Sequence, residues 1–176
     1  MSTAPLPLDR MARRMALVEE HVRCENAHDL DGVIRTFGDT SSYDDEPWDQ
    51  HHEGLDQVRN FYSQLMAALP DLSIEIVRQH VSDATIVLEV IIRGTQQGAW
   101  RGLPATGRRI EIPLCGVYTF CDDDRLAGER IYYDRAMIFR QLGVFHEPQT
   151  ALGDLTVLLT HPATIAKALL RKFRKA

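Results

Sequence analysis

The sequence has few of the features that mark membrane, secreted or metal-stabilised proteins. Only 3 of its 176 residues are cysteine, and no two of them form a Cys-x-x-Cys pair. A chain of this length needs no disulfide to support its core. No apolar run approaches the roughly 20 residues that span a bilayer, and the N-terminal residues lack the apolar core of a secretion signal. We therefore expect reduced thiols, no metal site and a cytoplasmic location.

Motifs that bind phosphate or activate a serine are also missing. The sequence contains no Gly-x-Ser-x-Gly, no P-loop and no Gly-x-Gly-x-x-Gly after a strand. Its net charge of -5 is unevenly distributed, because residues 161–176 carry five basic side chains and no acid. The acidic remainder would repel nucleic acid, so we expect no such partner.

The basic end, residues 161–176, has the pattern of an amphipathic helix, with apolar residues opposite its cations. Three alternatives remain open for it. It makes a weak contact with an anionic surface, it contacts a protein partner or a second copy of the chain, or it packs on its own domain.

Apolar periodicity divides the chain into helices followed by strands. In chain order we expect helices at 8–29, 30–37 and 54–69, an extended segment at 40–45, strands from 72, at 85–93, 109–121 and 126–133, and a helix at 135–142. An acidic, aromatic loop is expected after the extended segment. Helices that precede a run of antiparallel strands are typical of the α+β class. A strongly curved antiparallel sheet wrapped by helices forms a cone whose interior suits a small apolar ligand.

Three motifs resemble one known family. They are the loop Gly94–Arg108 (GTQQGAWRGLPATGR), the helix end Leu69–Leu72 (LPDL), and the segment Tyr132-Tyr133-Asp134 followed by Arg140–Gly143 (RQLG). Together they resemble the SnoaL-like polyketide cyclases, which belong to the nuclear-transport-factor-2-like superfamily. The resemblance covers roughly residues 10–143 and departs from the family at Gln96, where a histidine is usual. Gln96 cannot transfer a proton in the working pH range.

The resemblance implies a curved antiparallel sheet that forms a cone packed against three N-terminal helices. It implies one domain, residues 1–143, followed by a C-terminal helical extension at 144–176. It also implies a cofactor-free enzyme, which we expect to be a homodimer, acting by acid/base catalysis on a small hydrophobic carbonyl compound as a cyclase or isomerase. The superfamily allows two alternatives: epoxide opening similar to that of limonene-epoxide hydrolases, and non-catalytic binding of a small ligand.

Asp134 is the candidate general acid/base, since the resemblance places the family's catalytic aspartate there. Side chains alternate along a strand, so Arg130, Tyr132 and Asp134 share one face. If that face lines the cone, burial would raise the pKa of Asp134, whereas Arg130 would lower it. The alternative is that Asp134 caps the helix that begins at residue 135.

Other candidates lie in the predicted loops and strands. His52 is a candidate proton shuttle, and Tyr43 and Asp44 lie in the same segment near the expected pocket mouth. The aromatic residues Trp100, Tyr118 and Tyr132 are expected to shape the pocket; core packing is the alternative.

Two further pairs of titratable residues are explained more simply by surface ion pairs than by a catalytic role. Glu89 and Arg93 share a strand face and form an alternative acid/base set for epoxide opening, but we favour an ion pair on the outer face of the sheet. His21 and Glu25 lie one helical turn apart, and we favour a solvated pair on the helix surface.

Overall fold

The structure is a computed structural model that describes the backbone of residues 7–173 and the side chains of residues 7–167. Its elements, in chain order, are α1 (Leu8–Asn26), α2 (Leu30–Thr36), β1 (Phe37–Asp45), the 3-10 turn η1 (Glu46–Trp48), β2 (Gln50–Glu53), α3 (Leu55–Ala68), β3 (Ser73–Val81), β4 (Thr85–Thr95), β5 (Arg109–Phe120), β6 (Leu126–Tyr133), α4 (Arg135–Gln141), α5 (Ala151–Thr160) and α6 (Pro162–Phe173). The expected α+β order is confirmed.

Local sequence explains most element boundaries. Asp29 caps α2 by accepting a hydrogen bond from the backbone N–H of Gly32 at 2.8 Å, which satisfies a donor that the helix leaves free. Pro70 follows the C-terminal end of α3, where it cannot continue the helix. The acidic, aromatic segment after β1 is not only a loop: it contains the short strand β2, which pairs with β1.

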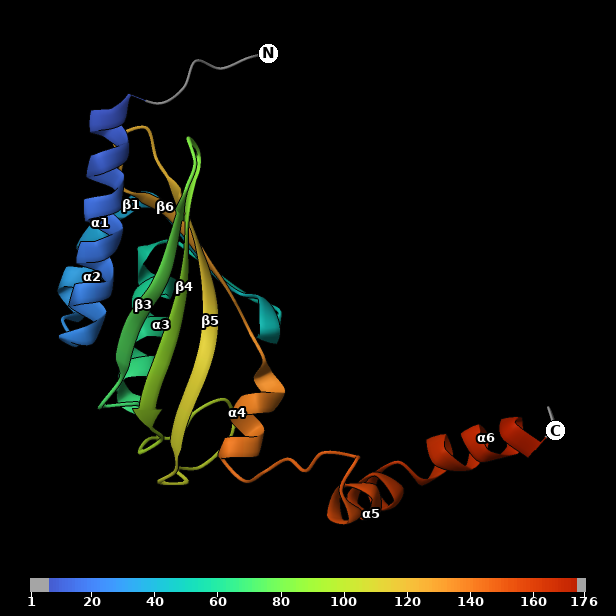
Figure 1. The fold of residues 1–176 in the computed structure, drawn as a ribbon. Helices are drawn as coiled ribbons and strands as arrows, with labels where there is room; N and C mark the ends of the chain where they lie inside the picture. Colours follow the sequence, from blue (N-terminus) through green and yellow to red (C-terminus); the bar gives the residue numbers. More distant parts are fainter. Residues whose placement is uncertain (1–6, 174–176) are drawn as a thin grey trace.

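Six strands form one curved, open sheet in the order β2-β1-β6-β5-β4-β3 (Figure 1). All neighbouring pairs are antiparallel except β1 and β6, which run parallel. The sheet is therefore mixed: the chain passes from β1 through β2, α3, β3, β4 and β5 before β6 returns beside β1. This arrangement places the end of β1 next to the end of β6.

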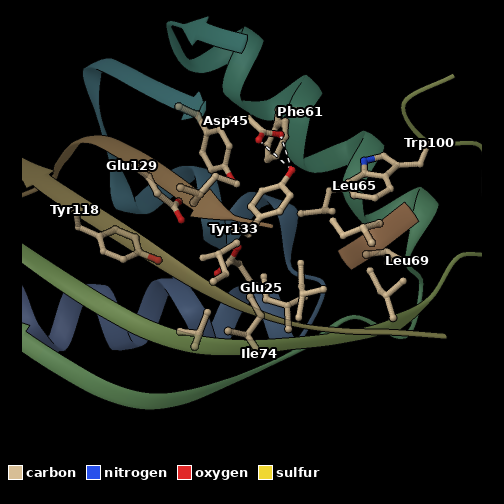
Figure 2. A pocket seen from close by; sticks show the side chains of 18 residues that line it. Glu25, Asp45, Phe61, Leu65, Leu69, Ile74, Trp100, Tyr118, Glu129 and Tyr133 are labelled. Carbon is tan, nitrogen blue, oxygen red and sulfur yellow. Dashed lines mark hydrogen bonds between the residues drawn. The ribbon is translucent and has the colours of Figure 1, made fainter. Parts of the chain in front are cut away.

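The helices α1, α2 and α3 lie on one side of the sheet, and α4 lies near the start of β5 (Figure 1). Between the sheet and α3 lies a cavity, shown in Figure 2. Its side chains come from α1, β1, α3, the strands β3 to β6, the loop before β5 and α4. Most elements of the curved-sheet region thus contribute at least one side chain to the cavity wall.

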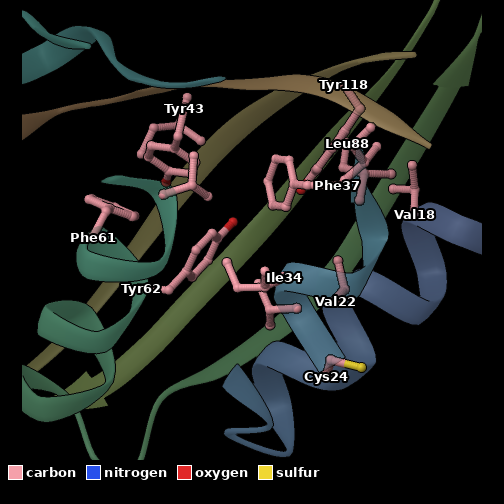
Figure 3. Close-up of a cluster of buried hydrophobic side chains, with 14 of the residues drawn as sticks. Val18, Val22, Cys24, Ile34, Phe37, Tyr43, Phe61, Tyr62, Leu88 and Tyr118 are labelled. Carbon is pink, nitrogen blue, oxygen red and sulfur yellow. The ribbon is translucent and has the colours of Figure 1, made fainter. Parts of the chain in front are cut away.

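Two clusters of buried apolar side chains hold this arrangement. The larger cluster joins α1, α2 and α3 to the sheet through residues such as Val18, Val22, Phe37 and Leu88 (Figure 3). The smaller cluster joins the end of α3 to β5 and α4 through residues such as Leu69, Ile112 and Ile138. Burial of such side chains stabilises the fold by about 1.5–3 kcal/mol each.

The segment after Gly143 contains two helices, α5 and α6, which lead away from the curved sheet in Figure 1. Packing of the terminal helix on its own domain is therefore not what this structure shows. Most of the basic side chains of residues 161–176 lie outside the described residues. Among the described residues, no helix is long and apolar enough to cross a membrane.

Candidate functional site

The cavity is mostly apolar but contains three carboxyl groups. Its walls include Phe61, Leu65, Ile92, Ile112, Leu114 and Ile131. Its volume is about 50 Å³, more than the roughly 10–15 Å³ needed to hold one water molecule. The carboxyl groups belong to Glu25, Asp45 and Glu129, each of which is at most 5% exposed. Burying a carboxylate in an apolar space costs free energy unless the group is hydrogen-bonded or paired with an opposite charge.

Asp45 is the last residue of β1 and lies on the cavity wall. Its carboxylate accepts a hydrogen bond from the Tyr133 hydroxyl, at 3.0 Å to Oδ1, and pairs with the Arg101 guanidinium. Burial raises the pKa of Asp45, although Arg101 and Tyr133 act in the opposite direction. An anchored carboxylate with a raised pKa is a better base than one in water.

Arg101 reaches Asp45 from the loop between β4 and β5. The loop turns tightly at Trp100–Leu103, where Arg101 and Gly102 both have positive φ angles, 52° and 79°. A glycine is favoured in such a turn because it has no Cβ. The turn directs Arg101 back over the rings of Trp48, Phe61 and Trp100, at 5.1 to 5.9 Å.

Gln96 holds the base of this loop. The buried side chain donates hydrogen bonds to the carbonyls of Gly98 and Pro104 and accepts them from the backbone and hydroxyl groups of Thr106. Residues Gln97 and Gly98 then bond to the end of α3. The residue that departs from the family pattern thus positions the loop.

A groove of about 810 Å³ adjoins the cavity and shares Phe61, Leu65 and Trp100 with it. We call it the mouth groove. It also contains His52 and Arg101. Burial, Arg101 and His51 lower the pKa of His52, so this histidine is neutral near pH 7. Among the described residues, His52 Nε2, Arg101 Nε and Trp48 Nε1 are buried without a hydrogen-bond partner, and all three side chains line this groove.

The opposite end of the cavity, which we call the inner end, is formed by Glu25, Tyr118 and Glu129. Figure 2 shows Glu25 below Tyr133, with Glu129 and Tyr118 to one side. Glu129 accepts a hydrogen bond from the Tyr62 hydroxyl at 2.6 Å and lies 3.3 Å from His21 Nε2. The expectation that His21 and Glu25 form a solvated pair is wrong, because His21 is fully buried and Glu25 is 5% exposed.

Asp134 lies outside the cavity. Its side chain accepts a hydrogen bond from Ala136 N at 2.8 Å, which caps α4, and pairs with Arg140 at 3.0 Å. Burial raises its pKa, but backbone amides and Arg140 together outweigh this effect, and the pKa is lowered. The prediction that Asp134 faces the interior is therefore wrong, and the alternative of a helix cap is confirmed.

The phase of β6 explains this error. Glu129, Ile131 and Tyr133 face the cavity, whereas Tyr132 is 45% exposed on the other side. The prediction placed the opposite set of alternating residues inside. Arg130 pairs with Asp44 and Glu46 instead of Asp134.

The other candidates divide between the two faces of the sheet. Tyr43, Trp100 and Tyr118 line the cavity, and His52 lines the mouth groove. Asp44 lies outside, where it bonds to His51 and Arg130.

Glu89 and Arg93 do not form an acid/base set. Glu89 pairs with Arg78 and His80. Arg93 pairs with Glu75 and Glu111. The favoured interpretation is correct for the outer face, but the expected ion pair between Glu89 and Arg93 is wrong, because each pairs with other residues.

Glu25, Asp45 and Glu129 were not predicted from the sequence to line the cavity, but for Glu25 the sequence contains a signal of burial. Met15, Val18, Val22 and Glu25 follow one another at spacings of three, four and three on a single helical face. A carboxyl group on an apolar stripe indicates a buried acid. Asp45 and Glu129 carry no comparable signal, since their faces depend on strand phase.

Comparisons with known proteins agree with this fold. A search of curated proteins finds no match. Among solved structures, AclR of Streptomyces galilaeus, a proposed hydroxylase, shares 25% identity with a TM-score of 0.67, over 77% of this chain and 99% of AclR. An LEH-like epoxide hydrolase of M. tuberculosis shares 19% identity with a TM-score of 0.61, over 85% and 97% of the two chains.

A third structure is SalBIII, an epoxide hydrolase/cyclase-like enzyme of pyran ring formation in the polyether salinomycin. It shares 17% identity with a TM-score of 0.61, over 70% of this chain and 92% of SalBIII. The profile of the SnoaL-like polyketide cyclases matches residues 15–142. The chain therefore belongs to the SnoaL-like polyketide cyclase family.

Proposed function

We propose that the protein is a cofactor-independent enzyme that acts by acid/base catalysis on a small hydrophobic carbonyl compound. The observation that carries this proposal is Asp45, a buried carboxylate on the wall of an apolar cavity, held by Tyr133 and Arg101. Its carboxylate removes a proton from the carbon next to a carbonyl, and the resulting enolate is shielded from water by the cavity walls.

Two outcomes follow from such an enolate. Its carbon attacks a second carbonyl of the same molecule and closes a ring, or it is reprotonated at another position and the compound is isomerised. In both, the proton taken by Asp45 returns to the product, so the enzyme ends unchanged. Asp45 thus takes the role that the sequence suggested for Asp134, and His52 in the mouth groove remains a candidate proton shuttle.

The test exploits two neighbouring aspartates with opposite environments. Asp45 faces the cavity, whereas Asp44 bonds to His51 and Arg130 on the outside. We expect wild-type protein in D2O to introduce deuterium next to the carbonyl of small cyclic ketones, measured by proton NMR. Asp45→Asn should slow this exchange at least about 100-fold, the usual minimum effect of losing a general base.

Asp44→Asn is the matched control and should exchange deuterium within about twofold of wild type. Circular dichroism should show both variants folded. Exchange that survives in folded Asp45→Asn would remove Asp45 from the mechanism.

Epoxide opening is a second candidate on the same residues. It is favoured by the combination of an anchored carboxylate, Asp45, with a second carboxyl group, Glu25, in one cavity. Structural relatives named as epoxide hydrolases share this fold. Hydrolysis of styrene oxide in ¹⁸O-labelled water, lost in Asp45→Asn, with no deuterium exchange into ketones, would select this reaction.

A further inference from the structure

The inner end of the cavity contains the carboxyl group of Glu25, which forms no hydrogen bond with another described side chain. Glu25 is 5% exposed, and among the described residues its carboxyl group has no hydrogen-bond partner. The nearest charged group is His21 Nε2, at 3.7 Å. The carboxyl group faces the cavity (Figure 2). Because the carboxyl group lies on the cavity wall, a polar group of a bound ligand can hydrogen-bond to it there.

The hydrogen bonds around His21 show that this ring is protonated on both nitrogens. The Thr36 hydroxyl donates to the Val33 carbonyl at 2.6 Å, so it accepts from His21 Nδ1 at 2.7 Å. The Tyr62 hydroxyl donates to Glu129 at 2.6 Å, so it accepts from His21 Nε2 at 3.0 Å. A histidine that donates from both nitrogens is an imidazolium.

Glu129 is the counter-ion of this imidazolium. It lies 3.3 Å from His21 Nε2 and also accepts the Tyr62 hydroxyl. One positive and one negative charge thus balance in this buried cluster. A second carboxylate at Glu25 would be an uncompensated charge in an apolar site, which is strongly unfavourable. Glu25 therefore keeps its proton.

The titration of the cluster agrees with this charge count. Burial raises the pKa of Glu25 to about 8, with a further contribution from Glu129 and an opposing one from His21. Burial lowers the pKa of His21, but Glu25 and Glu129 raise it more. The groups that face Glu25 are His21 from its own helix, Tyr43 from β1, Tyr62 from α3, Tyr118 from β5 and Glu129 from β6. The tyrosines stay neutral, because burial raises their pKa values further.

We propose that Glu25 is a second catalytic residue, a neutral carboxylic acid that donates its proton to the oxygen of a ketone or aldehyde bound at the inner end. This inference rests on the proposed function, because it supplies the acid that Asp45 needs as a partner. As Asp45 takes the proton from carbon, the carbonyl oxygen gains negative charge and receives the Glu25 proton, giving an enol and a Glu25 carboxylate. When the enol reacts onward, its O–H proton returns to Glu25. Glu129 is a positioning residue that, together with burial, keeps Glu25 protonated, and His21 holds Glu129 in place as its counter-ion.

The first experiment measures binding without turnover. The probe is cyclohexanone labelled with ¹³C at its carbonyl, and the measurement is the infrared stretching frequency of that bond. In wild-type protein the bound carbonyl should absorb at lower frequency than in an apolar solvent, and this shift should vanish as the pH rises past about 8, where Glu25 loses its proton. Glu25→Leu should lose the pH dependence and most of the shift.

Three further variants separate the possible causes. Glu25→Gln keeps a hydrogen-bond donor but no acidic proton, so it should retain a smaller shift that does not change with pH. Glu19→Gln, an exposed carboxyl group on the same helix, should behave as wild type. Asp45→Asn should leave the infrared shift intact while it abolishes deuterium exchange.

The second experiment measures rate. Glu25→Leu, which has no donor, should slow deuterium exchange into the ketone by about 100-fold, the usual effect of removing one oxyanion donor, and the fall in rate above about pH 8 should disappear. Exchange as fast in Glu25→Leu as in wild type, or a wild-type carbonyl frequency unaffected by Glu25→Leu, would overturn the inference. An infrared shift that depends on Glu25 without any exchange by wild type would instead support the subsite and overturn the proposed function.

Discussion

The two faces of strand β6 place similar residues in opposite physical environments. Glu129 and Tyr133 point into the cavity, while Arg130 and Asp134, their neighbours in sequence, lie outside it. The Glu129 carboxyl group is buried, lies beside the His21 ring and accepts a hydrogen bond from the Tyr62 hydroxyl. The outer groups form ion pairs that solvent screens. A charged group therefore costs more free energy, and interacts more strongly with its neighbours, on the inner face than on the outer face.

The same contrast separates Asp44 from Asp45 on β1. Burial raises the pKa of Asp44, but His51 and Arg130 together outweigh it and the pKa is lowered. Burial also raises the pKa of Asp45, and there it prevails over Arg101. Two adjacent aspartates thus acquire opposite acid strengths because successive side chains on a strand point to opposite sides. Of the two, the aspartate on the cavity wall is the weaker acid.

The largest effect on stability should come from Glu129. Glu129→Gln leaves the His21 imidazolium without its counter-ion in a buried site, and breaking one side of a buried pair costs about 3–5 kcal/mol. Arg130→Met is the matched change on the outer face. Its ion pairs with Asp44 and Glu46 are half exposed, so it should cost at most about 1 kcal/mol.

Urea denaturation of both variants measures the difference. The contrast between the faces requires Glu129→Gln to lower the free energy of unfolding clearly more than Arg130→Met does. Equal losses would show that the inner cluster is solvated in solution.

The two faces should also respond to pH in opposite directions. Glu25 has a pKa of about 8, above its ordinary value of 4.5, so the folded state holds an extra proton between these values. Its contribution to stability is complete below about pH 4.5 and is lost as pH rises toward 8. The raised pKa of His21 acts in the same direction above pH 6.5. The lowered pKa values of Asp44 and Asp134 give stability that is lost only as pH falls below about 4.

The measurement is the free energy of unfolding from pH 3 to 9. Wild type should lose stability between pH 5 and 8 by up to about 1.4 kcal/mol per pH unit for each proton released. Glu25→Gln should flatten this region, while Asp134→Asn should change only the acidic side. A wild-type profile that stays level from pH 5 to 8 would contradict a protonated Glu25.

The fold was predictable because its signals are long and redundant. The periodicity of α1, α3 and the strands β4 to β6 extends over 8 to 19 residues, and several residues have to agree before an element is assigned. The strand β2 has only four residues, three of them exposed, so it carries no periodic pattern. It forms because β1 provides a pairing partner, which is a tertiary effect.

The site was harder to predict because it depends on the phase of single strands. Moving the inward set on β6 by one residue exchanges Glu129 for Arg130 and Tyr133 for Asp134. Both alternating sets contain charged and aromatic residues, so hydrophobicity does not decide between them. Parallel pairing with β1 and the position of α4 fix the phase, and neither is visible in a local pattern.

The smallest expected effect concerns Asp134, for which a helix-capping role and a catalytic role predict different results. Asp134→Ala removes the side chain that bonds to Ala136 N and should cost about 1 kcal/mol of stability. Asp134→Asn retains a good capping residue and should cost less, losing only the half-exposed pair with Arg140. Both variants should exchange deuterium into ketones within about twofold of wild type, because Asp134 does not touch the cavity. A loss of exchange in folded Asp134→Asn comparable to that in Asp45→Asn would return the chemistry to the outer face of β6.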